Sequence, residues 1–223
     1  MKRTKIRDRL LPHYTLAEEL VNAISHGIGA LFGIAVLILC VIKACAAQNL
    51  FSIVGSAVYG ICMITLYTIS CVYHALRPGT AKKVLQILDH CTIYILIAGT
   101  YTPILLSAFI PTAPVAGWLL LGIQWGVTAL AIALNAVDLK RYRVFSYTAY
   151  IVLGWSIIFF IPVALRVLQE KALWLILWGG ISYTIGAVLY AIGSKKPWYH
   201  SIFHIFVVLG SLLQFWGIYL YVL

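Results

Sequence analysis

Long runs of apolar residues dominate the chain, and short polar connections separate them. Each run approaches or exceeds the roughly 20 residues that an α-helix needs to cross a bilayer core of about 30 Å. Proline or charged residues mark most connections, for example at positions 77–79, 138–143 and 195–197. The pattern therefore predicts an all-α, polytopic bundle of seven transmembrane helices. The helices are expected at residues 21–43, 50–76, 84–108, 114–137, 144–165, 172–194 and 197–222.

Basic residues are distributed unevenly between the two sides of this predicted bundle. The N-terminal tail and the second, fourth and sixth connections carry thirteen of the 16 Lys and Arg residues. Positively charged loops stay in the cytoplasm, so the N-terminus is expected there and the C-terminal Leu223 outside. Residues 1–20 are then a basic cytoplasmic tail, and residues 21–223 form the transmembrane domain. The thirteen residues are Lys2, Arg3, Lys5, Arg7, Arg9, Arg77, Lys82, Lys83, Lys140, Arg141, Arg143, Lys195 and Lys196.

The composition also indicates an integral membrane protein. Of the 223 residues, 63% are hydrophobic and 10% are charged, whereas a soluble domain carries about 25% charged residues. The net charge of +10 lies in the tail and the short connections, which suits anionic lipid headgroups rather than nucleic acid. The first apolar run exceeds the roughly 7–15 residues of a signal peptide, so we expect it to remain as a helix. The five cysteines form no CxxC pair, so no thiolate metal site is indicated.

Polar residues inside the predicted helices gather near one membrane surface. Because consecutive helices alternate in direction, these residues lie within about two turns of the cytoplasmic side. At a rise of 1.5 Å per residue, this corresponds to a layer roughly 10 Å thick. Ionisable groups at such a depth are costly and usually functional. The layer contains Asn22, Ser25, His26, His74, Asp89, His200 and His204.

Three histidines of this layer have the spacing of a metal site. His200 and His204 are four residues apart and share a helix face, and His74 is expected at the same depth on another helix. Three imidazoles can hold zinc and leave one tetrahedral position open for a catalytic water. Asp89 is placed to act as the general base for that water, and Ser70 lies one turn from His74. Histidines that merely bridge helices would show the same spacing.

The start of the first helix supplies a second group of polar residues, Glu19, Asn22, Ser25 and His26. One hypothesis is that they support the metal ligands from behind or contact a polar group of the substrate. Ordinary helix capping and a polar seam between helices explain them equally well.

Two further ionisable residues are given structural roles. His90 follows Asp89 and points about 100° away from it, so we expect a hydrogen bond between helices rather than a ligand. Asp138 lies close to basic residues in a predicted loop and is expected to be a solvated charge.

Five sequence blocks carry the polar residues described above, and together they resemble the hemolysin III family. This family is the bacterial branch of the superfamily that contains the adiponectin and progestin receptors. The resemblance covers nearly the whole chain. The blocks are Glu19-x-x-Asn22-x-x-Ser25-His26-Gly27, Ser70-x-x-Tyr73-His74, Asp89-His90-x-x-Ile93-Tyr94, Ala98-Gly99-Thr100-Tyr101-Thr102-Pro103 and His200-x-x-x-His204.

The resemblance implies a seven-helix bundle with a cytoplasmic N-terminus and a zinc ion on three histidines. The zinc ligands would be His74, His200 and His204, with Asp89 holding a water and Ser70 beside the metal. The receptor branch is linked to ceramide hydrolysis, and a wider superfamily includes alkaline ceramidases.

The leading hypothesis is a zinc-dependent intramembrane hydrolase of a lipid amide, ceramidase-like, in the plasma (inner) membrane of a bacterium. Its expected partner is a membrane lipid or acyl-amide substrate, and its expected role is membrane lipid homeostasis. Neither a nucleic acid nor a protein partner is indicated. The alternatives are a membrane receptor or lipid sensor with structural zinc, and a hemolytic, pore-forming factor. A pore would need polar residues across the whole bilayer, whereas the polar layer lies at one end.

Overall fold

The computed structural model describes residues 4–193 and 196–223, and within them every regular element is helical. Seven spans are long and apolar enough to cross a membrane, which confirms the predicted all-α, seven-helix fold. Lys2, Arg3, Lys195 and the predicted end of the sixth helix at residue 194 lie outside the described residues. The spans are α1 (Leu16–Ala46), α2 (Leu50–Ala75), Thr80–Thr112, α5 (Pro114–Asp138), Arg143–Val167, α8 (Glu170–Ile192) and α9 (Tyr199–Tyr221).

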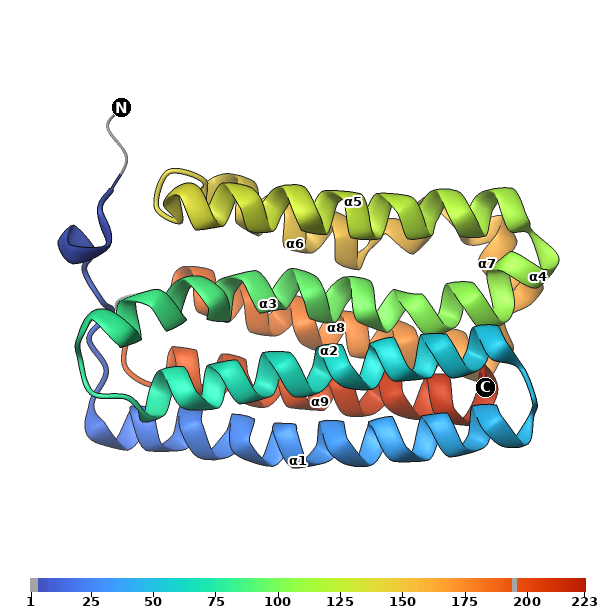
Figure 1. Cartoon of the computed structure of the whole chain (residues 1–223), viewed down its shortest axis with the longest axis horizontal. Coiled ribbons are helices and arrows are strands. Elements are labelled where there is room, and N and C mark those ends of the chain that lie inside the picture. Colours follow the sequence, from blue (N-terminus) through green and yellow to red (C-terminus); the bar gives the residue numbers. More distant parts are fainter. Residues whose placement is uncertain (1–3, 194–195) are drawn as a thin grey trace.

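The helix α3 (Thr80–Ile104) is the centre of the bundle. It packs between α2 and α5, while α1 packs against α2 and α9, and α8 packs against α9 (Figure 1). Close approach of α2 and α3 depends on Gly99, where an added Cβ would lie 2.5 Å from the Cβ atom of Cys62. The start of α1 and the end of α9 lie at opposite ends of the bundle (Figure 1), as an odd number of spans requires.

The first helix starts five residues before the apolar run that predicted it. Thr15 forms a capping box with Glu18: its hydroxyl accepts from the Glu18 amide at 3.3 Å, and its own amide donates to the Glu18 carboxylate at 2.8 Å. These two bonds satisfy amides that a helix start otherwise leaves free. The helix therefore begins before residue 21, the predicted start of the apolar run, and includes Glu19.

Two spans are interrupted. The third continues from α3 through a π-helical turn (Leu105–Phe109) into α4 (Ile110–Thr112), directly after Pro103, which lacks an amide hydrogen. The fifth consists of α6 (Arg143–Gly154), a 3-10 turn (Ser156–Phe160) and α7 (Ile161–Val167). The sequence pattern predicted one helix at residues 144–165 and gave no sign of the interruption.

Side chains from neighbouring helices satisfy the backbone at the break in the fifth span. The Tyr101 hydroxyl donates to the Gly154 carbonyl oxygen at 2.8 Å and accepts from the Ile157 amide at 3.2 Å. The Gln124 amide donates to the Leu153 carbonyl oxygen at 3.0 Å. Non-helical backbone at membrane depth is tolerated where protein groups satisfy it in this way.

Candidate metal centre

Three imidazoles meet near the end of the bundle that carries the N-terminus. His74 lies in the last turn of α2, and His200 and His204 lie in the first two turns of α9. The Nε2 atom of His200 is 3.2 Å from that of His74 and 3.1 Å from that of His204. One ring nitrogen from each of the three residues lies within 4.8 Å of the others. The structure thus brings together the three histidines that the sequence predicted as a set.

This geometry fits a metal ion. Tetrahedral coordination with bonds of about 2.0–2.1 Å to nitrogen places two ligands about 3.3 Å apart, close to the two separations found here. The Nδ1 atom of His74 lies 2.6 Å from Oε2 of Glu19, so it carries the proton and leaves a lone pair on Nε2. A cation at the meeting point would bind this lone pair together with the other two Nε2 atoms. His74 and His204 are buried and His200 is partly exposed.

A contact with α1 fixes the start of α9. Because His200 is the second residue of α9, this contact also fixes the position of His200. The amide of Trp198, which has a positive φ of 68°, donates to Oε1 of Glu18 at 2.6 Å. Glu18 therefore caps α1 with one carboxylate oxygen and holds the entry to α9 with the other. The sequence offered no signal for this second role.

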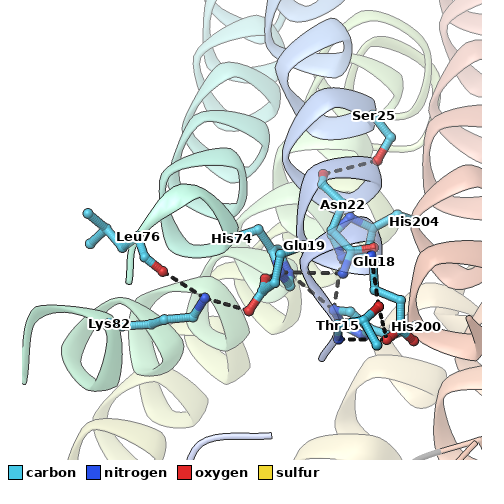
Figure 2. Close-up of polar contacts among 10 residues, drawn as sticks. All are labelled: Thr15, Glu18, Glu19, Asn22, Ser25, His74, Leu76, Lys82, His200 and His204. Carbon is cyan, nitrogen blue, oxygen red and sulfur yellow. Dashed lines mark hydrogen bonds and ion pairs between the residues drawn. The ribbon is translucent and has the colours of Figure 1, made fainter. Parts of the chain in front are cut away.

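A second carboxylate, that of Glu19, lies behind the metal centre. Its Oε2 atom contacts His74, and its Oε1 atom contacts the ammonium group of Lys82 at 2.6 Å (Figure 2). Lys82 also donates to the carbonyl oxygen of Leu76 at 2.9 Å and is buried. Sequence reasoning counted Lys82 only as a charge that fixes topology.

The other residues predicted to support the centre differ in what they contact. Asn22 is fully buried, and its Nδ2 atom lies 3.4 Å from Nδ1 of His74, a contact between two donors when Nδ1–H donates to Glu19. The ring of His26 stacks on that of His204, with centroids 3.7 Å apart. The hydroxyl of Ser25 donates to the carbonyl oxygen of Asn22, three residues earlier in its own helix, at 3.0 Å (Figure 2).

A cavity of about 490 Å³ leads away from the histidines into the bundle. His200, His204, Asp89 and Ser70 line it, which places the predicted carboxylate and hydroxyl in the same space as two of the predicted ligands. The lining continues along α3 as far as Ile104, about 22 Å from Asp89 at 1.5 Å per residue. Most of the remaining walls are apolar and come from α3, the fifth span, α8 and α9; they include Leu96 and Ile97 of α3, Ile158 of the 3-10 turn, Leu173 and Ile176 of α8, and Val207 of α9.

His90 has the structural contacts predicted for it. Its Nδ1–H donates to the Gln86 carbonyl oxygen at 2.8 Å, and its Nε2 accepts from the Tyr190 hydroxyl at 3.2 Å. Tyr190 lies on α8, so this hydrogen bond links α3 to α8. Gln86 and Tyr190 therefore hold the His90 ring, and His90 does not belong to the histidine cluster.

The prediction for Asp138 was wrong. The residue is 3% exposed rather than solvated, and its carboxylate accepts from the backbone amides of Thr4, Lys140 and Arg141 at 2.8, 3.1 and 3.2 Å. Backbone amides from the tail and the following turn replace water around this charge. A sequence pattern does not reveal such contacts, because one donor lies 134 residues away.

The tail passes over the metal centre on its way to α1. The Tyr14 ring stacks on His200 with centroids 4.9 Å apart, and it lies 5.8 Å from the centroid of His74. Burial raises the pKa of the Tyr14 hydroxyl well above its ordinary value, so this residue is neutral at physiological pH. Sequence reasoning missed Tyr14, since a single aromatic residue in a basic tail is no signal.

Comparison with known proteins agrees with this arrangement. The family model described as "Haemolysin-III related" matches residues 14–215, which includes every residue of the metal centre. The chain belongs to the hemolysin III family. This confirms the resemblance that the five sequence blocks indicated.

Two bacterial members of the hemolysin III family match almost end to end. Hemolysin-3 of Bacillus cereus is 39% identical over 206 residues, which is 92% of this chain and 92% of that protein. The Hemolysin-3 homolog of Bacillus subtilis (strain 168) is 36% identical over 208 residues, 93% of this chain and 96% of that protein. The human monocyte to macrophage differentiation factor is 26% identical over 174 residues, 74% of this chain and 68% of that protein. No solved structure matches the chain.

Proposed function

We propose that the chain is a zinc-dependent intramembrane hydrolase of a lipid amide, with the N-terminus in the cytoplasm of a bacterium and the bundle in its plasma membrane. One observation carries the proposal: a single cavity contains two of the three histidine ligands, Asp89 and Ser70 at one end, and apolar walls along the rest. Apolar walls suit an acyl chain, and the polar end suits the amide bond next to it. Release of fatty acid from membrane amides would serve membrane lipid homeostasis.

Each polar residue at this end of the cavity has a distinct task. His74, His200 and His204 would hold zinc, which when bound would supply a Lewis acid that polarises a carbonyl and lowers the pKa of water. Asp89 accepts the proton of the attacking water and returns it to the leaving nitrogen as the carbon–nitrogen bond breaks. Ser70 donates a hydrogen bond to the carbonyl oxygen as negative charge develops there. The products are a fatty acid and an amine.

The name of the bacterial relatives raises membrane lysis as an alternative. A water-filled pore needs polar residues along its whole length. Apolar side chains from four spans form most of the cavity walls away from the histidines. The cavity therefore favours an acyl chain over a column of water.

The decisive experiment is a turnover assay with purified, zinc-loaded protein and a panel of long-chain acyl amides and matched esters. Fatty acid release is measured by mass spectrometry, and a variant with His200→Ala and His204→Ala is the matched control. Turnover by the wild type alone supports the hydrolase. Tight binding of one lipid without turnover of any would replace it with a lipid sensor in which zinc is structural.

A further inference from the structure

Lys82 is a buried ammonium group within the metal centre. Its Nζ atom donates to Oε1 of Glu19 at 2.6 Å and to the carbonyl oxygen of Leu76 at 2.9 Å (Figure 2). It also lies 5.2 Å from the centroid of the Tyr73 ring. The residue is only 3% exposed. A buried charge is tolerated only when it is paired and hydrogen-bonded. Two hydrogen bonds and the Tyr73 ring therefore hold the ammonium group in place.

Glu19 connects this ammonium group to a metal ligand. One carboxylate oxygen contacts Lys82, and the other lies 2.6 Å from Nδ1 of His74. With a partner on each oxygen, the plane of the carboxylate is fixed. The Glu19 side chain is 18% exposed, so without Lys82 it would be able to turn toward water and leave the imidazole.

Lys82, Glu19 and His74, which are linked by these contacts, come from three different helices. Glu19 lies on α1, His74 on α2 and Lys82 in the first turn of α3. Asp89 follows Lys82 by seven residues on α3, about two turns. Lys82 therefore ties the helix that carries the carboxylate of the cavity to the helix that carries a ligand.

We propose that Lys82 is a positioning residue of the metal centre: it holds Glu19, which in turn fixes the ring plane and tautomer of His74. The proposal rests on the proposed metal site, because it assigns Lys82 a role in metal affinity. Groups that hydrogen-bond to metal-ligating histidines change affinity by about 10- to 100-fold when they are removed. We expect a change of that size even though Lys82 acts through an intermediate carboxylate.

The test is a competition titration of zinc between full-length protein in detergent and a chromogenic chelator. Lys82→Met should weaken zinc binding by about 10- to 100-fold, and Glu19→Gln should have a similar effect. Lys82→Arg should restore most of the affinity, since a guanidinium group also donates to a carboxylate. The variant with both Lys82→Met and Glu19→Gln should bind no more weakly than the weaker single variant, because both changes remove one contact.

The neighbouring lysine provides a matched control. Lys83 has the same charge, but its Nζ atom donates to the carbonyl oxygen of Arg7 at 2.6 Å instead of to Glu19. Lys83→Met should lower zinc affinity far less than Lys82→Met, because it loosens at most a contact of the tail and leaves Glu19 paired with His74. If Lys82→Met does not fold in detergent, Lys82→Gln, which keeps a donor for Leu76, takes its place.

An unchanged zinc dissociation constant in the Lys82→Met protein would overturn the role of Lys82. If the metal-free Lys82→Met protein also melts at a lower temperature, the role of Lys82 is purely structural. Wild-type protein that binds no zinc at all would instead overturn the metal centre itself, which is a distinct outcome.

Discussion

The ring of Tyr14 stacks on the ring of His200, with an interplanar angle of 17° and centroids 4.9 Å apart. Tyr14 belongs to the tail, and two hydrogen bonds hold that tail on the bundle: the Thr4 amide to Asp138, and Lys83 to the Arg7 carbonyl oxygen. The tail therefore covers the metal centre from the end of the bundle that carries the N-terminus. The cavity extends from the centre in the other direction, toward the middle of the bundle.

This cover should slow the exit of metal into water. Stacked aromatic rings contribute about 0.5–1.5 kcal/mol, so Tyr14→Ala should release zinc to a water-soluble chelator about two- to tenfold faster. Tyr14→Phe keeps the ring and should release zinc at the wild-type rate. Stopped-flow measurement with an excess of a chromogenic chelator gives these rates. Equal rates for Tyr14→Ala and the wild type would show that the tail does not limit access.

The three histidines should hold about one zinc per chain. The variant with His200→Ala and His204→Ala keeps a single histidine of the cluster, and we expect it to lose nearly all bound metal. His90→Ala and His13→Ala should stay near the wild-type content, because His90 is engaged by Gln86 and Tyr190 and His13 is exposed in the tail. Elemental analysis of the purified variants measures the content, and metal loss in His90→Ala would mean that the ligand set is wrong.

The common depth of the histidines was predictable from the sequence because it depends only on the lengths and alternating directions of the helices. Apolar runs of membrane length alternate in direction, so His74 near the end of one helix and His200 near the start of another must lie at one depth. The spacing of four residues then places His204 on the same helix face. Hydropathy and helix geometry therefore predict a shared depth and, for His200 and His204, a shared face, and the packing of the helices brings the three rings into contact.

The contacts behind the histidines were not predictable in the same way. The sequence pattern predicts that Lys82 and Asp138 are solvated charges in loops. Both are buried instead: Lys82 contacts Glu19, and Asp138 accepts from the Thr4 amide. The break after Gly154 depends on the Tyr101 hydroxyl, which lies on another helix. Local patterns describe one helix at a time, whereas these features depend on how the helices pack.

The orientation of the bundle can be tested by fusions. Of the described Lys and Arg residues, all but Lys43, Arg166 and Lys171 lie at the end of the bundle where α1 starts; these are Lys5, Arg7, Arg9, Arg77, Lys82, Lys83, Lys140, Arg141, Arg143 and Lys196. Such a bias keeps that end in the cytoplasm. A reporter that is active only outside the cytoplasm should be active after Leu223 and inactive in the turn that follows Asp138. Activity in the turn and none after Leu223 would reverse the proposed orientation.

The packing of α3 on α2 gives a prediction about stability. A Cβ atom at Gly99 would lie 2.5 Å from Cβ and 2.7 Å from Sγ of Cys62. Gly99→Ala should therefore lower the free energy of unfolding by about 1–3 kcal/mol through overpacking. Gly126→Ala is the matched control on α5, where nothing lies within 4 Å of the added atom. Denaturant unfolding in detergent compares the two, and equal stabilities would contradict the close approach of the helices.

Asp89 separates catalysis from metal binding, because it lines the cavity without belonging to the histidine cluster. Asp89→Asn keeps the size of the side chain but removes its ability to take a proton at neutral pH. We expect this variant to retain zinc and to lose about 100-fold or more of its lipid amide hydrolysis, the scale of losing a general base.

Ser70 is the companion test for that prediction. Ser70→Ala removes one hydrogen bond to the developing negative charge, and a well-placed donor of this kind is worth about 1,000-fold at most, against up to about 10,000-fold for a general base. The rate of lipid amide hydrolysis by Ser70→Ala should therefore fall by less than that of Asp89→Asn, while its zinc content stays constant. Rates of fatty acid release and metal content, measured on the same preparations, decide the matter. Loss of zinc in Asp89→Asn would show that Asp89 supports the metal, and full activity in that variant would remove it from the mechanism.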